Sequence, residues 1–560
     1  MPGVSAPILF LALATSASPA VTGSTTAPAV SAVLNADSFA GSDIGQKINN
    51  AVSACPAFPI GCTITVQKSG TISTPPDLPT GTKLVFNPTG TYELAANWVI
   101  AHRGVTVDFG NAPFRYALDN GTPAIYVGKN IAAAVSIRGS TVTWVSGTQF
   151  SSVDVGDQMQ WCTETQAQCA TGRGVAAANV AGVTSPTSIT LTAPVTTPFS
   201  NVAATFGMVP DTALGANPGQ TIVLTDLHII GTARQTNPSD VGLRLELVSS
   251  ATVRGLTVSN LGRGTCLSLR GTLSTDFYDV RCQVDGSGII MDQNIIGGLL
   301  VTGSNANRFF GVDLAASNDL AGWALLIKAS SLNAVYGARV EGNLSDHPAV
   351  IQGSIGNSIN LVDWERNGSS AATDLTLDGA PNTVIYGPAQ FESLVSPGGI
   401  SLTASAQVRI QDLMIAGSYT TGFDSLSSSS GQLVNVSFGS GERVGTSGFI
   451  VENQNGLGNL SIPGTITAAS VKSSSAFELA AATARLGGAL LTPGCHNQSA
   501  ITVTGAATTM ACVMSGAGGT QPTNIQASCF VSAANTVVPQ LCTAVATTPT
   551  AQTYNIRVIQ

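Results

Sequence analysis

The sequence predicts an all-β protein built on a right-handed parallel β-helix of about 25 residues per coil, with an inserted small β-domain and a C-terminal β-domain. Two observations predict this fold. The chain of 560 residues is poor in charge, at 10% against about 25% in typical proteins, and rich in glycine, with 60 residues. A repeat of about 25 residues also runs through the second half of the chain.

The composition excludes several classes of protein. A net charge of -8 without a cluster of Lys and Arg excludes a basic nucleic-acid binder, because nothing would neutralise the phosphates. A hydrophobic content of 44% argues against disorder. A coiled coil or helical bundle needs about half Ala, Glu, Lys, Leu and Arg, which this chain lacks.

Residues 1–37 are expected to form a signal-like leader. The apolar run at residues 8–14 is too short to span a membrane, and Ser18, Pro19 and Ala20 fit a signal-peptidase site. The alternative is a floppy N-terminal arm. No other segment has the pattern of a transmembrane helix, so we expect a secreted, extracellular or virion-associated protein without a membrane span.

The ten cysteines support an oxidising compartment, because most lie in local couples. The couples are Cys55 with Cys62, Cys162 with Cys169, and Cys266 with Cys282, and four more cysteines lie near the C-terminus. The sequence has no C-x-x-C motif and only four scattered histidines. Disulfides are therefore favoured over zinc, and we expect neither a metal nor a cofactor.

Residues 38–134 are predicted to start the β-helix with a capping helix. Ile44, Ile48 and Val52 repeat at helical spacing, and Ser42 or Asp43 suits the N-cap. Residues 135–210 lack the coil repeat and carry paired strand patterns, which indicates an inserted β-domain. Residues 211–440 are the predicted coils, 441–490 a connector rich in small residues, and 491–560 a disulfide-bearing β-domain.

The coil repeat is clearest where four segments each begin with asparagine, at Asn307, Asn333, Asn357 and Asn382. The steps between them are 26, 24 and 25 residues. Stacked coils bury a shared interior, and equivalent asparagines can then form a hydrogen-bonded ladder. A leucine-rich repeat of similar length would need a regular leucine spacing, which is absent.

The opening of the chain resembles the start of the pectate-lyase superfamily, in which such a helix caps the first coil. The resemblance rests on the helix at residues 43–49, on Cys55 followed by Pro56, and on the strands ending at residues 90–94. The segment 150–157 is similar to modules of phage tailspikes and tail fibres. The resemblance implies an extracellular polysaccharide as partner and lyase or glycosidase activity. However, the Asn-Thr-Asp, Asp-Asp and Gly-His-Gly motifs of the polygalacturonases are absent, as is an acidic cluster like the calcium site of pectate lyases.

Charge gathers on residues 307–368, and the repeat aligns it. Glu341 and Glu365 fall at equivalent positions, which would place them about 5 Å apart on adjacent coils. Two carboxyl groups at that distance raise one pKa and match the retaining glycosidases, and wider pairs match the inverting ones. The predicted catalytic residues are Glu341, Asp363, Glu365 and Asp313, and the predicted substrate-binding residues are Arg339, Arg366, Trp364 and Tyr336.

The sequence leaves two functions open. The aromatic residues would offer flat faces to sugar rings and the arginines would hold an acidic sugar, or stabilise an enolate in a lyase. A solvated face of a β-helix would equally use an Asp–Arg–Asp stack to avoid repulsion between like charges. The first hypothesis is an exported protein that binds or cleaves polysaccharide, as a glycosidase or a polysaccharide lyase. The second is a non-catalytic fibre, adhesin or tailspike-like protein, for which the resemblance to tailspikes implies a homotrimer.

Overall fold

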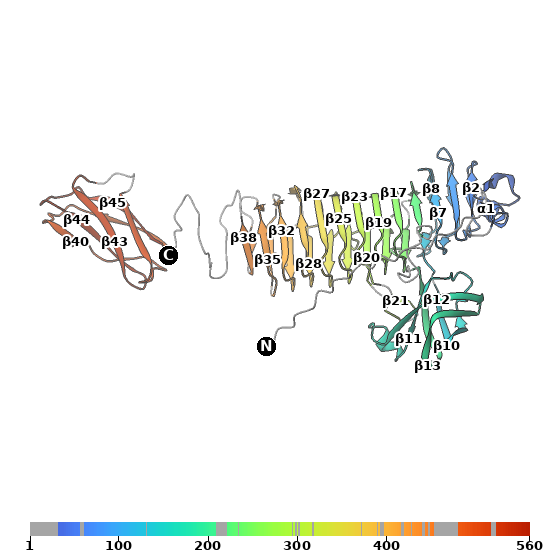
Figure 1. Cartoon of the computed structure of the whole chain (residues 1–560). Helices are drawn as coiled ribbons and strands as arrows, with labels where there is room; N and C mark the ends of the chain where they lie inside the picture. The colour runs from blue at the N-terminus through green and yellow to red at the C-terminus, as the bar shows by residue number, and fades with distance from the viewer. Residues whose placement is uncertain are drawn as a thin grey trace, which may run out of the picture. The chain divides into compact units, whose positions relative to one another are not determined.

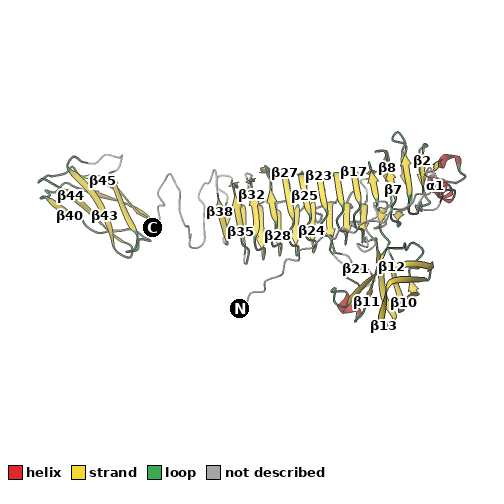
Figure 2. Cartoon of the chain, viewed as in Figure 1, coloured by secondary structure: helices red, strands yellow, loops and turns green. Residues whose placement is uncertain are grey.

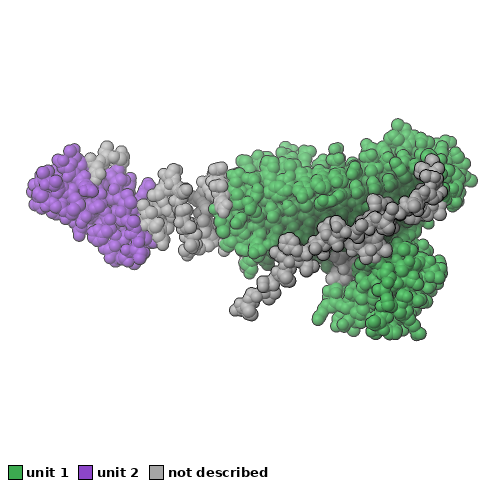
Figure 3. Space-filling view, viewed as in Figure 1, with its two compact units in different colours: residues 1–464 green, residues 465–560 purple. Residues whose placement is uncertain are grey.

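The computed structural model describes residues 32–56, 61–129, 131–208, 221–452 and 480–559, with gaps inside the last two ranges at 233–234, 294, 297–298, 301–302, 316–318, 371, 389, 393–396, 416–418, 427, 439–442, 446–447 and 517–521. Most of the predicted leader and of the predicted connector therefore lies outside the described residues. Residues 1–464 and 465–560 form two compact units, coloured separately in Figure 3.

The first unit is a parallel β-helix, so the predicted all-β fold with coils of about 25 residues is confirmed (Figures 1 and 2). Its larger sheet, here called the long sheet, contains β1 (Ala32–Asn35), β2 (Cys62–Val66), β3 (Gly70–Ile72), β4 (Thr82–Phe86), β5 (Tyr92–Leu94), β7 (Thr106–Asp108), β8 (Pro113–Tyr116), β14 (Val223–Thr225), β15 (His228–Ile230), β17 (Thr252–Ser259), β19 (Asp276–Gln283), β23 (Arg308–Ala315), β25 (Ala334–Glu341), β27 (Ser358–Glu365), β29 (Val384–Tyr386), β30 (Gln390–Glu392), β32 (Val408–Gln411), β33 (Met414–Ile415), β35 (Gly431–Val434), β36 (Ser437–Phe438) and β38 (Phe449–Glu452).

A second parallel sheet closes each coil on the other side. It contains β6 (Trp98–Ile100), β9 (Pro123–Val127), β16 (Val241–Glu246), β18 (Thr265–Arg270), β20 (Ser287–Asp292), β24 (Leu325–Lys328), β26 (Ala349–Gln352), β28 (Thr373–Asp378), β31 (Gly398–Thr403), β34 (Thr421–Ser425) and β37 (Arg443–Gly445). A short hairpin of β21 (Ile295–Ile296) and β22 (Leu299–Leu300) follows β20. It lengthens that coil, which is why the register of β19 and β23 skips 32 residues.

Four of the five eight-residue strands of the long sheet are bent at their fourth residue, which has a positive φ. This bend residue is Gly255 in β17, Asp279 in β19, Gly311 in β23 and Gly337 in β25, with φ between 52° and 74°. A left-handed residue turns the strand direction, and glycine adopts it without strain. The coil thereby gains a corner within one strand, and the residues on both sides of the corner keep their register with the next coil.

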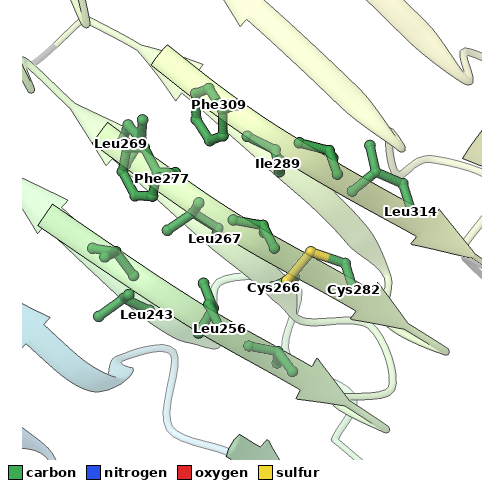
Figure 4. Packing of buried hydrophobic residues seen from close by; sticks show 14 of the residues in the cluster. Leu243, Leu256, Cys266, Leu267, Leu269, Phe277, Cys282, Ile289, Phe309 and Leu314 are labelled. Carbon is green, nitrogen blue, oxygen red and sulfur yellow. A yellow bond between two sulfur atoms is a disulfide. The ribbon is translucent and has the colours of Figure 1, made fainter. Parts of the chain in front are cut away.

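The interior of the β-helix is a continuous apolar column. Figure 4 shows part of it, where Leu267, Phe277, Ile289 and Phe309 pack between the two sheets. The rings of Phe277 and Phe309 stack with centroids 4.5 Å apart, because equivalent residues of adjacent coils lie one strand spacing apart. Such stacking explains why one coil cannot be stable alone.

The asparagine ladder forms, although not with all four predicted members. Asn333 donates to Asn357 Oδ1 at 3.1 Å and accepts from Asn307 Nδ2 at 3.0 Å, and all three side chains are buried. The prediction for Asn382 is wrong, because Ser358 pairs with Val384 and the ladder position therefore falls on Thr383. Asn382 instead takes the turn position before it, with φ of 57°.

All ten cysteines are paired, and the three predicted local couples are confirmed. Cys266 and Cys282 join β18 to β19 inside the core (Figure 4). The C-terminal four pair as Cys495 with Cys542 and Cys512 with Cys529. Disulfides of this number are typical of proteins that fold in an oxidising compartment.

The capping helix α1 (Ile44–Ser53) begins at the predicted N-cap Asp43, whose side chain accepts from the backbone N–H of Gly45 and Gln46. Its buried face contains Ile44 and Ile48, which close the first coil. Among the described residues, neither α1 nor the four-residue α2 (Gln166–Cys169) has the length and apolar character needed to cross a membrane.

The region that lacks the coil repeat is an antiparallel sheet with a core of its own. The strands of this insert are β10 (Ala132–Gly147), β11 (Gln158–Cys162), β12 (Val175–Ser185) and β13 (Ser188–Gly207). The second unit is also antiparallel and contains β39 (Ala480–Leu486), β40 (Gly494–Asn497), β41 (Ile501–Thr502), β42 (Ala511–Gly516), β43 (Ile525–Ala533), β44 (Thr536–Thr543) and β45 (Gln552–Ile559). Its small core centres on Val537, Leu541 and Ile556.

Candidate functional site: charge columns on the long sheet

The predicted catalytic carboxylates lie on three successive strands of the long sheet, β23, β25 and β27 (Figure 1). Asp313 pairs in register with Arg339, Arg339 with Asp363, and Glu341 with Glu365. The register expected from the repeat is therefore confirmed for these residues. Because residues in register on neighbouring strands are about 4.7–4.9 Å apart, their side chains form columns along the helix axis.

The first of these columns, here called the alternating column, is Arg281, Asp313, Arg339 and Asp363. Each arginine lies between positions that carry a carboxylate or a neutral residue, so no like charges face each other. Opposite charges in register stabilise a sheet by about 0.2–1 kcal/mol per pair. This column has the charge order that a solvated β-helix face needs for stability.

Arg339 is the electrostatic centre of the site. Its Nε donates to Asp363 Oδ2 at 3.1 Å, and its guanidinium also donates to Glu341 Oε2. The hydrogen bond to Asp363 and the charge of Glu341 raise the pKa of Arg339 above its usual range. Arg339 therefore orients these two carboxylates, which leaves it less suited to the predicted role of holding an acidic sugar.

The second column, here called the glutamate column, contains Glu341, Glu365 and Glu392 on three successive coils. No cation is interposed in this column. Within the part of the chain that the structure describes, Glu341 is ion-paired with Arg339, whereas Glu365 has no ion pair. Like charges in register destabilise a sheet. The glutamate column thus carries a cost in stability that the neighbouring alternating column avoids.

The prediction that Trp364 offers a face to sugar is wrong. Its side chain is 1% exposed, because Trp364 is one of the inward residues of β27. The ring stacks on Phe391 of the next coil at 4.7 Å, and its Nε1 donates to Asp374 Oδ2 at 3.0 Å. The alternation of inward and outward residues in a strand gives Glu365 and Asp363 the outward positions and Trp364 the inward one.

The side chain of Tyr336 is on the outer face of β25 and is 39% exposed. It belongs to an aromatic column of Tyr278, Phe310 and Tyr336, whose rings stack at 5.0 and 5.1 Å with nearly parallel planes. The guanidinium of Arg254 lies 5.0 Å above the ring of Tyr278 and covers the other end. From the sequence, only Tyr336 was predicted to contact substrate. That Tyr278 and Phe310 stack in line with it is apparent only once the strands of adjacent coils are paired.

Arg366 follows Glu365 at the end of β27 and is exposed. It adopts φ of 54°, which is uncommon for a residue other than glycine, and its backbone N–H donates to Glu392 O at 2.7 Å. The structure therefore places this predicted residue in the turn directly beside the glutamate column.

A second cluster of charges, not predicted from the sequence, joins the insert to the β-helix. Lys129 Nζ lies 2.7 Å from Asp154 and 2.8 Å from Asp157, and Arg103 Nε lies 2.8 Å from Asp157. Lys129 and Asp157 are buried. His102 Nδ1 contacts Asp154 at 2.8 Å beside a pocket of about 290 Å³. Burial acts to raise the pKa of Asp154, but the hydrogen bond from His102 and the charge of Lys129 outweigh it and lower the pKa.

The sequence contained a signal for this cluster. Asp154 and Asp157 frame a glycine turn in the insert, and buried aspartates need partners. Their partners Arg103 and Lys129 come from the turns of early coils, and only the folded chain shows that they meet. Among the residues that the structure describes, no group of three His, Cys, Asp or Glu side chains is arranged to hold a metal ion.

Comparison with known proteins identifies no family, since no family model and no curated protein matches. The chain is similar to solved structures, among them the tailspike gp61 of Pseudomonas phage phi297, at 10% identity with 92% of both chains covered and a TM-score of 0.29. It is also similar to the enzymatically active domain of tailspike protein 2 of bacteriophage CBA120, at 11% identity over 93% of this chain and 70% of the other, with a TM-score of 0.37. A third is the A-module of mannuronan C-5 epimerase AlgE6 of Azotobacter vinelandii, at 12% identity over 78% and 100%, with a TM-score of 0.33. At these scores the similarity does not identify an activity.

Proposed function

We propose that the chain binds a polysaccharide on the outer face of the long sheet and hydrolyses it with Glu341 and Glu365. The observation that carries the proposal is the contrast between adjacent columns. One column alternates its charges, whereas the other stacks Glu341, Glu365 and Glu392 without a cation. A destabilising arrangement beside an optimised one favours a role in function over a role in stability.

The two glutamates differ in their surroundings, which separates their roles. Glu341 is fixed by Arg339, so it is the carboxylate suited to attack the anomeric carbon. Glu365 has carboxylates in register on both sides, so it is the group suited to deliver a proton to the leaving oxygen. Their strand separation of about 5 Å matches the spacing of retaining glycosidases.

The other predicted site residues support this pair. Asp363 holds Arg339 from the opposite side, and Asp313 occupies the next position of the alternating column. Arg366 follows Glu365 in the turn beside the glutamates, and Tyr336 is exposed in β25 on the other side of the bend at Gly337; both are candidates for sugar contact. The five disulfides favour function outside the cell or on a virion.

The experiment is a screen for new reducing ends released from a panel of acidic and neutral polysaccharides. The Glu365→Gln and Glu341→Gln variants should each lose at least about 100-fold in rate, since each removes an acid–base or nucleophilic group. Glu93→Gln is the matched control, because Glu93 is an exposed glutamate of the same sheet on an early coil. Full activity in the Glu365→Gln variant would rule out the proposed chemistry.

A non-catalytic fibre or adhesin is the second candidate, because the ion pairs of Arg339 and the stacked rings of the aromatic column fit a purely structural surface. In that case the wild type would bind a polysaccharide without releasing ends, and Glu365→Gln would leave binding unchanged. The homotrimer stays a prediction, and sedimentation equilibrium of the full chain tests it.

A further inference from the structure

One lysine is enclosed where the insert joins the β-helix. The side chain of Lys129, just after β9, has no exposed surface, whereas every other lysine that the structure describes is partly or fully exposed. Its Nζ lies 2.7 Å from Asp154 Oδ2 and 2.8 Å from Asp157 Oδ2. Asp157, just before β11, is completely buried. A primary amine thus contacts two carboxyl groups in a place that excludes bulk water.

The two carboxyl groups differ in their protonation. Burial is the main influence on Asp157 and raises its pKa, although the charges of Lys129 and Arg103 act against it. Burial acts in the same direction on Asp154, but the hydrogen bond from His102 and the charge of Lys129 outweigh it and lower the pKa. The neutral form is therefore favoured at Asp157 and the ionised form at Asp154. An amine can attack a neutral carboxyl group, and an ionised one can act as the base.

The other contacts of Asp157 suit attack by the amine. Arg103 Nε donates to Asp157 Oδ1 at 2.8 Å, where the negative charge of a tetrahedral intermediate would develop. The backbone N–H of Asp154 donates to Asp157 Oδ2 at 2.7 Å. The carboxyl group is therefore fixed at both oxygens, with Oδ2 toward the amine of Lys129.

A purely structural network would not need a lysine at this position. Among the described residues, every other ion pair that does not involve His102 is made by an arginine. Arginine keeps its proton in proteins and cannot act as a nucleophile, whereas a lysine beside a base can. The residue type at position 129 is thus the one that allows covalent chemistry.

We propose that Lys129 and Asp157 condense to an isopeptide bond, which joins the insert covalently to the end of β9 in the β-helix. The ion pair is the starting state. One proton passes from Nζ through Asp154 to Asp157 Oδ2, which leaves a neutral amine and a neutral carboxyl group. Nζ then attacks Cγ, and Asp154 carries a second proton from the nitrogen to Oδ2. The bond from Cγ to Oδ2 breaks, and Oδ2 leaves as water.

This condensation is balanced within the cluster. Nζ loses two protons, both of which leave with Oδ2, and Asp154 ends as the carboxylate that it was at the start. No oxidant or activated donor is consumed. A pocket of about 290 Å³, lined in part by His102 and Asp154, lies beside the cluster and can take up the water. The inference goes beyond the proposed function and involves none of the stacked glutamates.

The test is mass spectrometry of the wild-type full chain after its disulfides are reduced and alkylated. The chain should be lighter by one water molecule than its residues require. Trypsin should release the peptides 116–138 and 139–173 as one branched species, because it does not cleave after an acylated lysine. Fragmentation of that species should locate the bond between Lys129 and Asp157.

Three variants separate the bond from the ion pairs. Lys129→Arg keeps the charge but cannot condense, so it should have the full mass and yield separate peptides. Asp154→Asn removes the proton carrier, and after cell-free synthesis its branched peptide should appear about 100-fold more slowly. Lys83→Arg, which changes an exposed lysine of β4, should leave the branched peptide unchanged.

The decisive measurement is made on the wild type, so it does not depend on the folding of any variant. A wild type with its full mass, or a loss of water that Lys129→Arg retains, would overturn the bond. Attachment at Asp154 in place of Asp157 would overturn the assignment of the electrophile. These outcomes are independent of whether the chain cleaves a polysaccharide.

Discussion

Replacing Glu365 by lysine should abolish cleavage and at the same time raise the stability of the β-helix. A neutral substitution would not separate these two effects as clearly. Glu365 lies between Glu341 and Glu392 in the glutamate column, with both neighbours in register. Lysine at this position would convert two like-charge contacts into two opposite-charge contacts. The column would then alternate as its neighbour already does.

The expected gain follows from the geometry. Each cross-strand charge pair changes stability by about 0.2–1 kcal/mol, and two pairs reverse their sign. Arg339 already neutralises Glu341, so that pair contributes the smaller share. We expect Glu365→Lys to stabilise the β-helix by about 1 kcal/mol at low salt while cleavage is lost. Asp363→Lys is the matched control, because it removes the ion pair with Arg339 and places two cations in register, which should destabilise by a similar amount.

Differential scanning calorimetry of the full chain at low and at 1 M salt measures both variants. Since the Debye length falls to about 3 Å at 1 M, the gain of Glu365→Lys should largely disappear there. A Glu365→Lys variant that is less stable than the wild type at low salt would refute the assignment of the glutamate column as a cost in stability. A gain that persists at 1 M salt would show that its cause is not electrostatic.

Three further predictions follow from buried polar groups. Asn333→Ala removes four hydrogen bonds of the asparagine ladder and should lower the free energy of unfolding by about 2–5 kcal/mol in urea denaturation, with faster hydrogen exchange of the Asn307 amide. Asn382→Gly is the control outside the ladder and should change the free energy of unfolding by less than about 0.5 kcal/mol. Lys129→Met leaves Asp157 without one of its two cations and should cost about 3–5 kcal/mol, seen as earlier unfolding and faster proteolysis of the insert, whereas unchanged proteolysis would contradict this. Burial raises the pKa of Asp285 well above its usual range, so the folded chain keeps a proton that the unfolded chain releases above about pH 4, and the stability of the fold falls as the pH rises from there. In thermal denaturation, Asp285→Asn should therefore be more stable than the wild type at pH 7 and equally stable at pH 3. A variant that is less stable than the wild type at pH 7 would contradict the assignment.

The fold could be predicted because the residues that repeat are ones that every coil needs for its stability. Asn307, Asn333 and Asn357 recur because each must satisfy backbone groups of its neighbours inside the turn. Asn382 shows the limit of this argument. Threonine also fills a buried ladder position, and asparagine is equally suited to the positive φ of the residue before it. One residue type thus serves two adjacent positions, and only pairing of the strands tells them apart.

The candidate site was predictable to the level of register and no further. Counting from each asparagine placed Glu341 opposite Glu365 and Arg339 opposite Asp363, because a stacked coil repeats its positions. Counting could not show which carboxylate Arg339 would hold, since a flexible side chain reaches along its own strand as easily as across to the next. The alternation of a strand did contain the information that Trp364, between the outward Asp363 and Glu365, faces the core.

The distribution of charge therefore has two causes that the structure separates. In the alternating column, Arg281, Asp313, Arg339 and Asp363 are explained by the stability of the sheet, and no further role is needed for their presence. The glutamate column is not explained in this way, because a lysine at its middle position would satisfy the same rule better. A chain in which only 10% of residues are charged, and in which one column is ordered by sign, retains three stacked glutamates beside it. Their repulsion is the reason to look for the chemistry at Glu365.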